Sequence, residues 1–381
     1  MTITSEATSY SGSPNEWLSK EDRRSITDRS HVRAFAILFA HYLLYFGSLY
    51  GALMQAPLIA NLGFAFINGL AIALLFVIGH DGVHRAYAPS KFGNQLIARL
   101  GFIPCAHSAS LFELVHNKNH HSRTNLRGVD CVWTPMDVDD YRNAPFIKRL
   151  FYRFYRSSFG PLLYYSTDIW ATKHFIPLTA QARSEWKRHL PDSILSVSSL
   201  ILTVGTVLVL GKYLAPERSL LTVFLVGWLA PFIVWTYIAS FSFYVQHTHP
   251  NLHWFDDPKE WSFFKTSIAG TVHVDIPVKL SGIYCDSMAH TAHHAMPTTP
   301  IYKLAKAQEI LLEKYGDFII QYKFTPQNYH RVVKACKLYD YKNQHWTDFT
   351  GNATGPTITE TPIFQMIDNA QNPDPANQPL Q

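Results

Sequence analysis

Four long apolar runs divide the chain. The first two, 34–54 and 58–79, are joined by a short turn at 55–57, and the last two, 193–210 and 219–245, by a short polar segment. Each run is close to the length of about 20 helical residues that crosses a ~30 Å hydrocarbon core. Two tightly joined pairs predict two helical hairpins, and both ends of each hairpin then return to the same side of a membrane.

Two other segments are partly apolar. The segment 92–111 carries Arg99 and His107, so we expect a helix that dips into the membrane or lies on it rather than a fifth span. The segment 146–155 mixes large apolar side chains with Lys148 and Arg149, which predicts an amphipathic helix at the lipid headgroups. The pattern as a whole predicts an all-α integral membrane protein with four transmembrane helices and a helical cap.

The ends of the chain are polar. We expect a disordered N-terminal tail over 1–30, one membrane domain over 31–350, and a disordered C-terminal tail over 351–381, which is rich in Pro, Asn, Thr and Gln. No cleavable signal peptide is evident, because the first thirty residues are polar.

Composition agrees with a membrane location. Charged residues make up 16% of the chain, below the ~25% that is usual in soluble domains. The net charge of +5 is mild, which suits a surface against anionic lipid better than a nucleic-acid groove, so we expect no nucleic-acid partner. The four cysteines form no CxxC motif and fit a reducing compartment; they are Cys105, Cys131, Cys285 and Cys336.

Most of the 19 histidines fall in four groups at the polar ends of apolar runs or just beyond them. Within three groups the spacing is three or four residues, which places imidazoles on one helix face. Neutral imidazole is the commonest metal ligand in proteins. Nine candidates are too many for one tetrahedral zinc, so the count predicts two metal ions sharing a site. The candidates are His80, His84, His116, His120, His121, His247, His290, His293 and His294.

Carboxylates beside these groups are candidates for orienting metal-bound imidazoles through hydrogen bonds. Asp81, Asp130 and Asp286 each lie near one group, and Glu113 is a weaker candidate. His249 is either a further ligand or an outer partner of the site.

Charge predicts the orientation of the hairpins. Two hairpins place both termini and all four histidine groups on one side, together with nearly all of the Lys and Arg residues. The opposite loops carry only Lys212 and Arg218, offset by Glu217. Because cytoplasmic loops are enriched in Lys and Arg, we expect the histidines on the cytoplasmic face.

The order and content of the histidine groups resemble the membrane-bound fatty acid desaturase family over residues 30–330. The motifs that carry the resemblance are Gly79-His80-Asp81, His120-His121-Ser122-x-Thr124, Gln246-His247-Thr248-His249-Pro250, and Ala292-His293-His294 followed by Met296-Pro297. They are similar to the acyl-lipid branch of the Δ12 or ω-6 type. Two departures from that type leave the regioselectivity open: the first group reads Asp-Gly-Val-His, and three residues separate His116 from His120.

The resemblance implies a di-iron centre, with the nine histidines named above as ligands, in the cytoplasmic cap of four helical spans. It implies a cis double bond introduced into a lipid acyl chain with O2 and two electrons. The substrate would be an acyl lipid or an acyl thioester. No His-Pro-Gly-Gly haem motif is present, so a separate donor, a ferredoxin or a cytochrome b5-like protein, would supply the electrons. The segment 146–155 is then alternatively a docking face for that donor.

Two other functions stay open. A hydroxylase or ketolase acting on a fatty acid, an alkane or a carotenoid would use the same scaffold and the same ligands. A membrane metal transporter or sensor would place ionisable residues inside the spans, where the runs hold only His41 and no carboxylate. The size of the chain and the polar N-terminus favour a multi-pass protein of a bacterial inner membrane.

Overall fold

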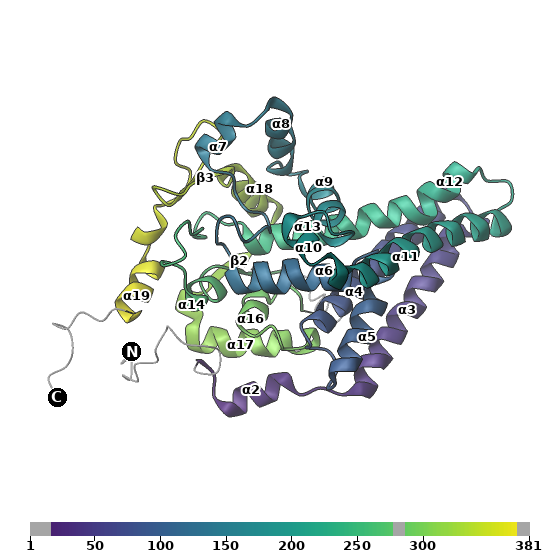
Figure 1. The fold of residues 1–381 in the computed structure, drawn as a ribbon, viewed down its shortest axis with the longest axis horizontal. Helices are drawn as coiled ribbons and strands as arrows, with labels where there is room; N and C mark the ends of the chain where they lie inside the picture. The colour runs from purple at the N-terminus through teal and green to yellow at the C-terminus, as the bar shows by residue number, and fades with distance from the viewer. Residues whose placement is uncertain (1–16, 277–285, 372–381) are drawn as a thin grey trace.

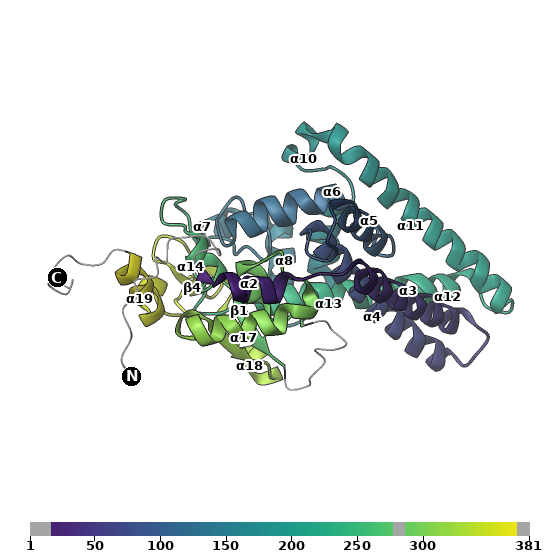
Figure 2. The ribbon, with the colours of Figure 1, turned by 90° about the horizontal axis from the view of Figure 1, so that it is seen from below.

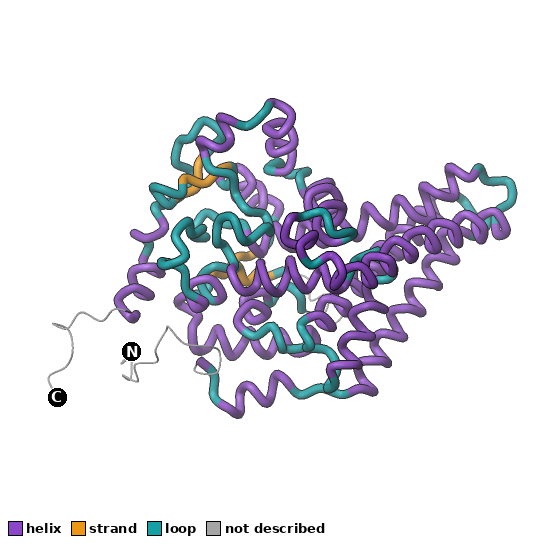
Figure 3. The backbone as a smooth tube through the Cα atoms, in the orientation of Figure 1, coloured by secondary structure: helices purple, strands orange, loops and turns teal. Residues whose placement is uncertain are grey.

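The computed structural model describes residues 17–276 and 286–371, and most of these residues are helical (Figure 3). Four helices are long and apolar enough to cross a membrane: α3 (His31–Leu53), α4 (Leu58–Val83), α11 (Trp186–Leu214) and the continuous helix Leu220–His247. The last of these joins α12 (Leu220–Phe224), the π-helical η4 (Leu225–Leu229) and α13 (Ala230–His247). The four predicted spans are confirmed, and the protein is an integral membrane protein.

The spans form two hairpins that project from one side of the molecule, while the remaining elements gather at the opposite end (Figure 1). The two far turns are held together by one side chain. Arg218 donates hydrogen bonds to the carbonyl of Ala56 and to the amide oxygen of Asn61, and Asn61 in turn donates to the carbonyls of Gly51 and Met54. These polar groups satisfy one another where the backbone turns between helices.

Helix α4 is the central span and packs against α3, α5 and α13. Small residues allow these helices to approach closely. A Cβ atom added at Gly69 would lie 2.5 Å from the Cβ of Val234 on α13. A Cβ added at Gly101 on α5 would lie 2.6 Å from the backbone nitrogen of Gly79. Glycine is therefore required where α4 meets both neighbours.

The two partly apolar segments form short helices. Helix α5 (Lys91–Phe102) spans 12 residues, or about 18 Å at ~1.5 Å per residue, which is too short to cross a bilayer. Helix α8 (Phe146–Tyr155) has the bounds predicted for an interfacial helix and buries none of its residues. Phe146 and Ile147 are 68% and 60% exposed, so α8 presents an apolar face that the described protein does not cover. Its contact with lipid headgroups stays a prediction.

The remaining elements build the cap over the ends of the spans (Figure 2). Its strands are short, with β1 (Val272–Asp275) parallel to β2 (Ile320–Lys323) and β3 (Leu338–Asp340) antiparallel to β4 (His345–Thr347). The helices are α6 (Ala109–Phe112), η1 (Glu113–His120), η2 (His121–Arg123), α7 (Val138–Asn143), α9 (Pro161–Tyr164), η3 (Tyr165–His174), α10 (Ala180–Ser184), α14 (Phe263–Ser267), α16 (His290–Ala295), η5 (Ile301–Lys303), α17 (Leu304–Tyr315), η6 (Gly316–Phe318) and α18 (Pro326–Ala335).

Ordered structure extends further toward both ends than the composition indicates. Helix α2 (Lys20–Thr27) begins with a capping box between Ser19 and Asp22, and Trp17 before it is buried. Near the other end lie η7 (Ile358–Glu360) and α19 (Pro362–Gln371), and Phe364 on α19 is buried. A few apolar side chains dock these polar segments onto the cap. Of the tails predicted at 1–30 and 351–381, the parts 1–16 and 372–381 lie outside the described residues, as does Cys285.

Substitution of Gly69 by alanine is expected to lower the melting temperature of the purified protein, because the added methyl group collides with Val234 where α4 meets α13. Gly63→Ala on the same helix is the matched control, since a Cβ added there meets nothing within 4 Å. Thermal unfolding in detergent, followed by size-exclusion chromatography, measures both. Equal melting temperatures for the two variants would contradict the close contact.

Candidate metal centre

The four histidine groups come together in the cap, at the ends of the two inner spans. His80 lies in the last turn of α4, and His84 is the residue that ends this helix. His247 is the last residue of α13. The second group lies in η1 and η2, and the third lies in α16. All nine predicted histidines are at most 8% exposed.

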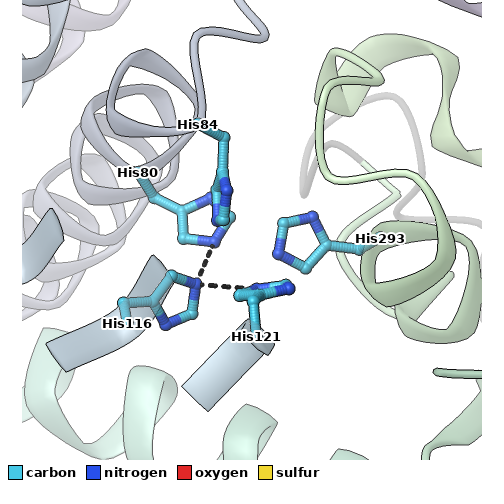
Figure 4. A group of neighbouring side chains, drawn as sticks. All are labelled: His80, His84, His116, His121 and His293. Carbon is cyan, nitrogen blue, oxygen red and sulfur yellow. Dashed lines mark hydrogen bonds between the residues drawn. The ribbon is translucent and has the colours of Figure 1, made fainter. Parts of the chain in front are cut away.

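Their ring nitrogens form two groups, in each of which the candidate ligand atoms lie within 4.8 Å of one another. Cluster A contains five histidines, and Figure 4 shows their rings turned toward a common centre. Cluster B contains four. The clusters adjoin where the rings of His121 and His294 stack at 4.1 Å between centroids. Cluster A is His80, His84, His116, His121 and His293; cluster B is His120, His247, His290 and His294.

A π-helix explains how the second group is divided between the clusters. An α-helical reading pairs His116 with His120, four residues later. In η1, however, the backbone N–H of His121 reaches the carbonyl of His116, five residues earlier, as well as that of Asn117. This wider turn places His116 and His121 on the same side, with their Nε2 atoms 3.1 Å apart, and turns His120 toward cluster B. π-Helical turns are rare and occur frequently at functional sites.

In the short helix α16, ordinary α-helical spacing divides the third histidine group between the two clusters. His290 and His294 are four residues apart and share cluster B, with their Nε2 atoms 3.1 Å apart. His293 points to cluster A instead. His247 completes cluster B, and its Nε2 atom lies 2.7 Å from that of His290.

The residues fit metal ions. Ligand nitrogens about 2.1 Å from one ion lie about 3.0 Å apart at right angles and about 3.4 Å apart in a tetrahedron. The observed distances between ring nitrogens are 2.7–3.1 Å, including 2.9 Å between His80 and His116. Among the described residues, the Nε2 atoms of His84, His120 and His293 are buried without a hydrogen-bond partner. Converging, unpartnered imidazole nitrogens are suited to binding metal.

Electrostatics favours the ligand form of these rings. Burial, followed by the nearness of other imidazoles, lowers the pKa of His116, His121 and His293 well below the ordinary value. These rings are therefore neutral at physiological pH, and neutral imidazole is the form that binds a metal.

Two of the predicted carboxylates orient histidines. Asp130 accepts a hydrogen bond from Nδ1 of His120 at 2.9 Å, and its other contacts are the backbone N–H groups of Asn125 and Val132. Asp81 lies 3.1 Å from Nδ1 of His80 and also accepts a hydrogen bond from the backbone N–H of Ile301. Each carboxylate holds the Nδ1–H tautomer and leaves Nε2 free to face the cluster.

The other predicted partners lie elsewhere. His249 belongs to neither cluster and packs against Tyr322. Glu113 forms an ion pair with Arg188. Within the described contacts no hydrogen bond joins the Asp286 side chain to a histidine, and its role stays a prediction. Sequence reasoning missed Thr124, whose hydroxyl lies 3.2 Å from Nδ1 of His294 and donates to the carbonyl of His120.

A narrow cavity of about 50 Å³ begins at the clusters and runs between α4 and α13. His80, His290 and His293 line one end of it. The other lining residues are mostly apolar or small: Ala73, Phe76, Val77, Ala239, Ser242, Phe243, Gln246, Ser287, Ile301 and Leu304. The cavity therefore offers an apolar ligand a position directly beside both clusters.

Comparison with known proteins places this arrangement in a family. The fatty acid desaturase family model matches residues 57–326. The chain is 29% identical to sn-1 oleoyl-lipid 12-desaturase of Synechocystis sp. over 283 residues, which cover 74% of this chain and 76% of that protein. It is 28% identical to the chloroplastic omega-6 fatty acid desaturase of Spinacia oleracea over 284 residues, covering 74% of this chain and 60% of that protein.

A third relative is the sn-1 acyl-lipid omega-3 desaturase (ferredoxin) of Nostoc sp., which is 27% identical over 258 residues, covering 67% of this chain and 68% of that protein. The family match spans more than half of the chain and includes all nine clustered histidines. This protein therefore belongs to the fatty acid desaturase family and is a membrane fatty acid desaturase, an oxidoreductase.

Proposed function

We propose that this protein introduces a cis double bond into the acyl chain of a membrane lipid, using O2 and two electrons at a di-iron centre. The observation that carries the proposal is the pair of adjoining, buried, all-histidine clusters beside an apolar cavity. Cluster A holds one iron and cluster B the other, through His80, His84, His116, His121 and His293 and through His120, His247, His290 and His294.

Chemical reasoning supports iron. An alkane C–H bond has neither an acidic proton nor a leaving group, so a redox-active cofactor must supply the oxidising power. Zinc also binds histidine but has no redox chemistry. Nitrogen spacings near 3 Å suit neighbouring ligands at right angles better than a tetrahedral zinc site. Bound iron would supply the reaction with O2.

The protein's own residues position the substrate. The cavity between α4 and α13 would take the reacting segment of one acyl chain, and Ala73 and Ala239 leave room for it where larger side chains would fill the space. Apolar walls exclude water and fix the depth at which a methylene pair passes His80 and His293. The position of the new double bond depends on that depth.

The similarity to proteins named 12-desaturase and omega-6 desaturase supports Δ12 or ω-6 regioselectivity on a lipid-linked oleoyl chain. The relative whose name includes ferredoxin supports a separate, one-electron donor of the ferredoxin or cytochrome b5 type. The nearly exclusive placement of Lys and Arg on the histidine side supports a cytoplasmic active site in a bacterial inner membrane.

Expression in a host that makes monounsaturated but not polyunsaturated lipids, together with a matching donor, tests the proposal. A new diene should appear in the fatty acids and should be lost in His294→Ala, because this change removes a cluster B nitrogen. His330→Ala, at an exposed histidine outside both clusters, is the control and should keep the product. A hydroxy or keto product would assign the related oxygenase activity instead, and purified protein without iron would refute the di-iron centre.

Asp130→Asn is expected to weaken metal binding by about 10- to 100-fold, because the amide no longer accepts the Nδ1–H of His120 as a charged partner. Metal per protein after dialysis against graded chelator concentrations measures the change. Asp139→Asn in α7, whose side chain is 82% exposed, should behave like the unchanged protein. Equal metal retention in both variants would show that Asp130 does not orient a ligand.

Ala239→Phe is expected to abolish most of the product while leaving the metal content unchanged, because the ring fills the cavity beside the clusters. Ala40→Phe on the exposed surface of α3 is the matched control. Fatty-acid analysis and metal content are measured on the same preparations. Full activity of Ala239→Phe would exclude this cavity as the acyl site.

A further inference from the structure

A second buried polar pair lies close to cluster A and takes no part in holding it. Tyr165 begins η3, and His107 lies in the loop between α5 and α6. The two side chains are 1% and 3% exposed, and the tyrosine hydroxyl lies 2.9 Å from Nε2 of His107. A buried phenol hydrogen-bonded to an imidazole is an unusual group to place beside a site that reacts with O2.

The surroundings fix the direction of this hydrogen bond. Nδ1 of His107 lies 2.9 Å from the carbonyl oxygen of Cys105, and a carbonyl only accepts, so Nδ1 carries the proton. Burial lowers the pKa of His107 to about 3, so the ring is neutral at physiological pH. Nε2 therefore accepts from the phenol, and a base stands ready at the tyrosine hydroxyl.

Aromatic rings connect the pair to the centre. The ring of Phe243 lies 5.9 Å from that of Tyr165 and 6.4 Å from that of His116. On the other side the ring of Trp235 lies 5.5 Å from Tyr165. The Tyr165 ring is thus separated from a cluster A histidine by a single aromatic side chain.

We propose that Tyr165 is a redox-active residue that protects the enzyme when O2 reacts at the centre without an acyl chain in the cavity. The inference rests on the proposed function. One electron passes from the phenol to the centre, and the phenolic proton moves to Nε2 of His107, leaving a neutral tyrosyl radical and an imidazolium. An electron from the external one-electron donor then reduces the radical, and the proton returns from His107 to the phenolic oxygen. A second electron that passes by the same route removes the remaining oxidising equivalent from the centre.

Bond strength and acidity make Tyr165 a suitable residue to be oxidised near the centre. A phenol O–H bond is weaker than a methylene C–H bond, so a centre able to oxidise the substrate is able to oxidise a phenol within reach. Loss of the electron makes the phenol strongly acidic, and proton transfer to a hydrogen-bonded base keeps the radical neutral in a buried site. Uncontrolled oxidation would otherwise fall on the ligand histidines themselves.

The adjacent Tyr164 is a matched control. Its hydroxyl donates to the carbonyl of Cys131 at 3.0 Å and accepts from the backbone N–H of Trp133. It is buried, and within the described part of the chain both groups that its hydroxyl contacts belong to the backbone, so neither is a base for its proton. Tyr164 should therefore stay reduced under conditions in which Tyr165 is oxidised.

The test uses the iron-loaded, reduced enzyme, mixed with O2 in the absence of acyl substrate and frozen for electron paramagnetic resonance. An organic radical should form, its spectrum should narrow when ring-deuterated tyrosine is incorporated, and it should be absent in Tyr165→Phe and present in Tyr164→Phe. Tyr165→Phe should also complete several-fold fewer turnovers before inactivation, with its initial desaturation rate retained.

His107→Gln separates the redox role from a structural one, because an amide oxygen accepts the hydrogen bond but does not take up the proton. This variant should lose the radical while keeping the melting temperature. Two results would overturn this inference without affecting the proposed function. One is a radical that persists in Tyr165→Phe; the other is enzyme that consumes O2 and makes product but forms no tyrosyl radical. Protein that binds no iron or consumes no O2 would instead overturn the proposed function.

Discussion

Imidazole nitrogens that approach to 2.7–3.1 Å inside a protein repel one another through their lone pairs unless a proton or a cation lies between them. Six of the nine rings in the two buried, adjoining clusters make such an approach. Shared protons would have to be held at a position where burial opposes charge, whereas two metal ions satisfy all nine nitrogens at once. Metal bound at the clusters would therefore contribute directly to the stability of the cap.

The need to bring these imidazoles together explains why segments that are distant in the sequence are held close to one another in the cap. Helices α4 and α13 supply His80 and His247 from their ends, so their separation sets the separation of the clusters, and Gly69 lets the two helices meet closely. Asp81 ties His80 to the backbone of Ile301, beyond the third histidine group. Asp130 ties His120 to its own loop. Each carboxylate therefore orients an imidazole with one oxygen and holds a backbone segment of the cap with the other.

The membrane spans and the membership of the clusters could be predicted from the sequence, because both depend on local patterns along the chain. Apolar runs of sufficient length predicted all four spans, and the histidine spacing predicted eight of the nine cluster members. His247 was added because it directly follows the last apolar run. The division between clusters could not be predicted, because it depends on a π-helical turn at His116–His121 for which helix propensity gives no signal. Helix α19 was missed because its tertiary contacts through Phe364 outweigh a polar composition.

Burial of the centre also has a cost for the protein. In the proposed function, the apolar walls of the cavity would keep water away from the substrate and would hold an acyl chain beside His80 and His293. When that chain is absent, the same walls leave protein side chains as the nearest groups to be oxidised. Phe76 and Phe243 line this wall, and the ring of Tyr165 lies 6.0 and 5.9 Å from their rings. Contact with a base makes a phenol easier to oxidise reversibly. Tyr165 has such a contact and Tyr164 does not, although the two are adjacent in sequence. The position of one imidazole thus decides which side chain is oxidised when the substrate is missing.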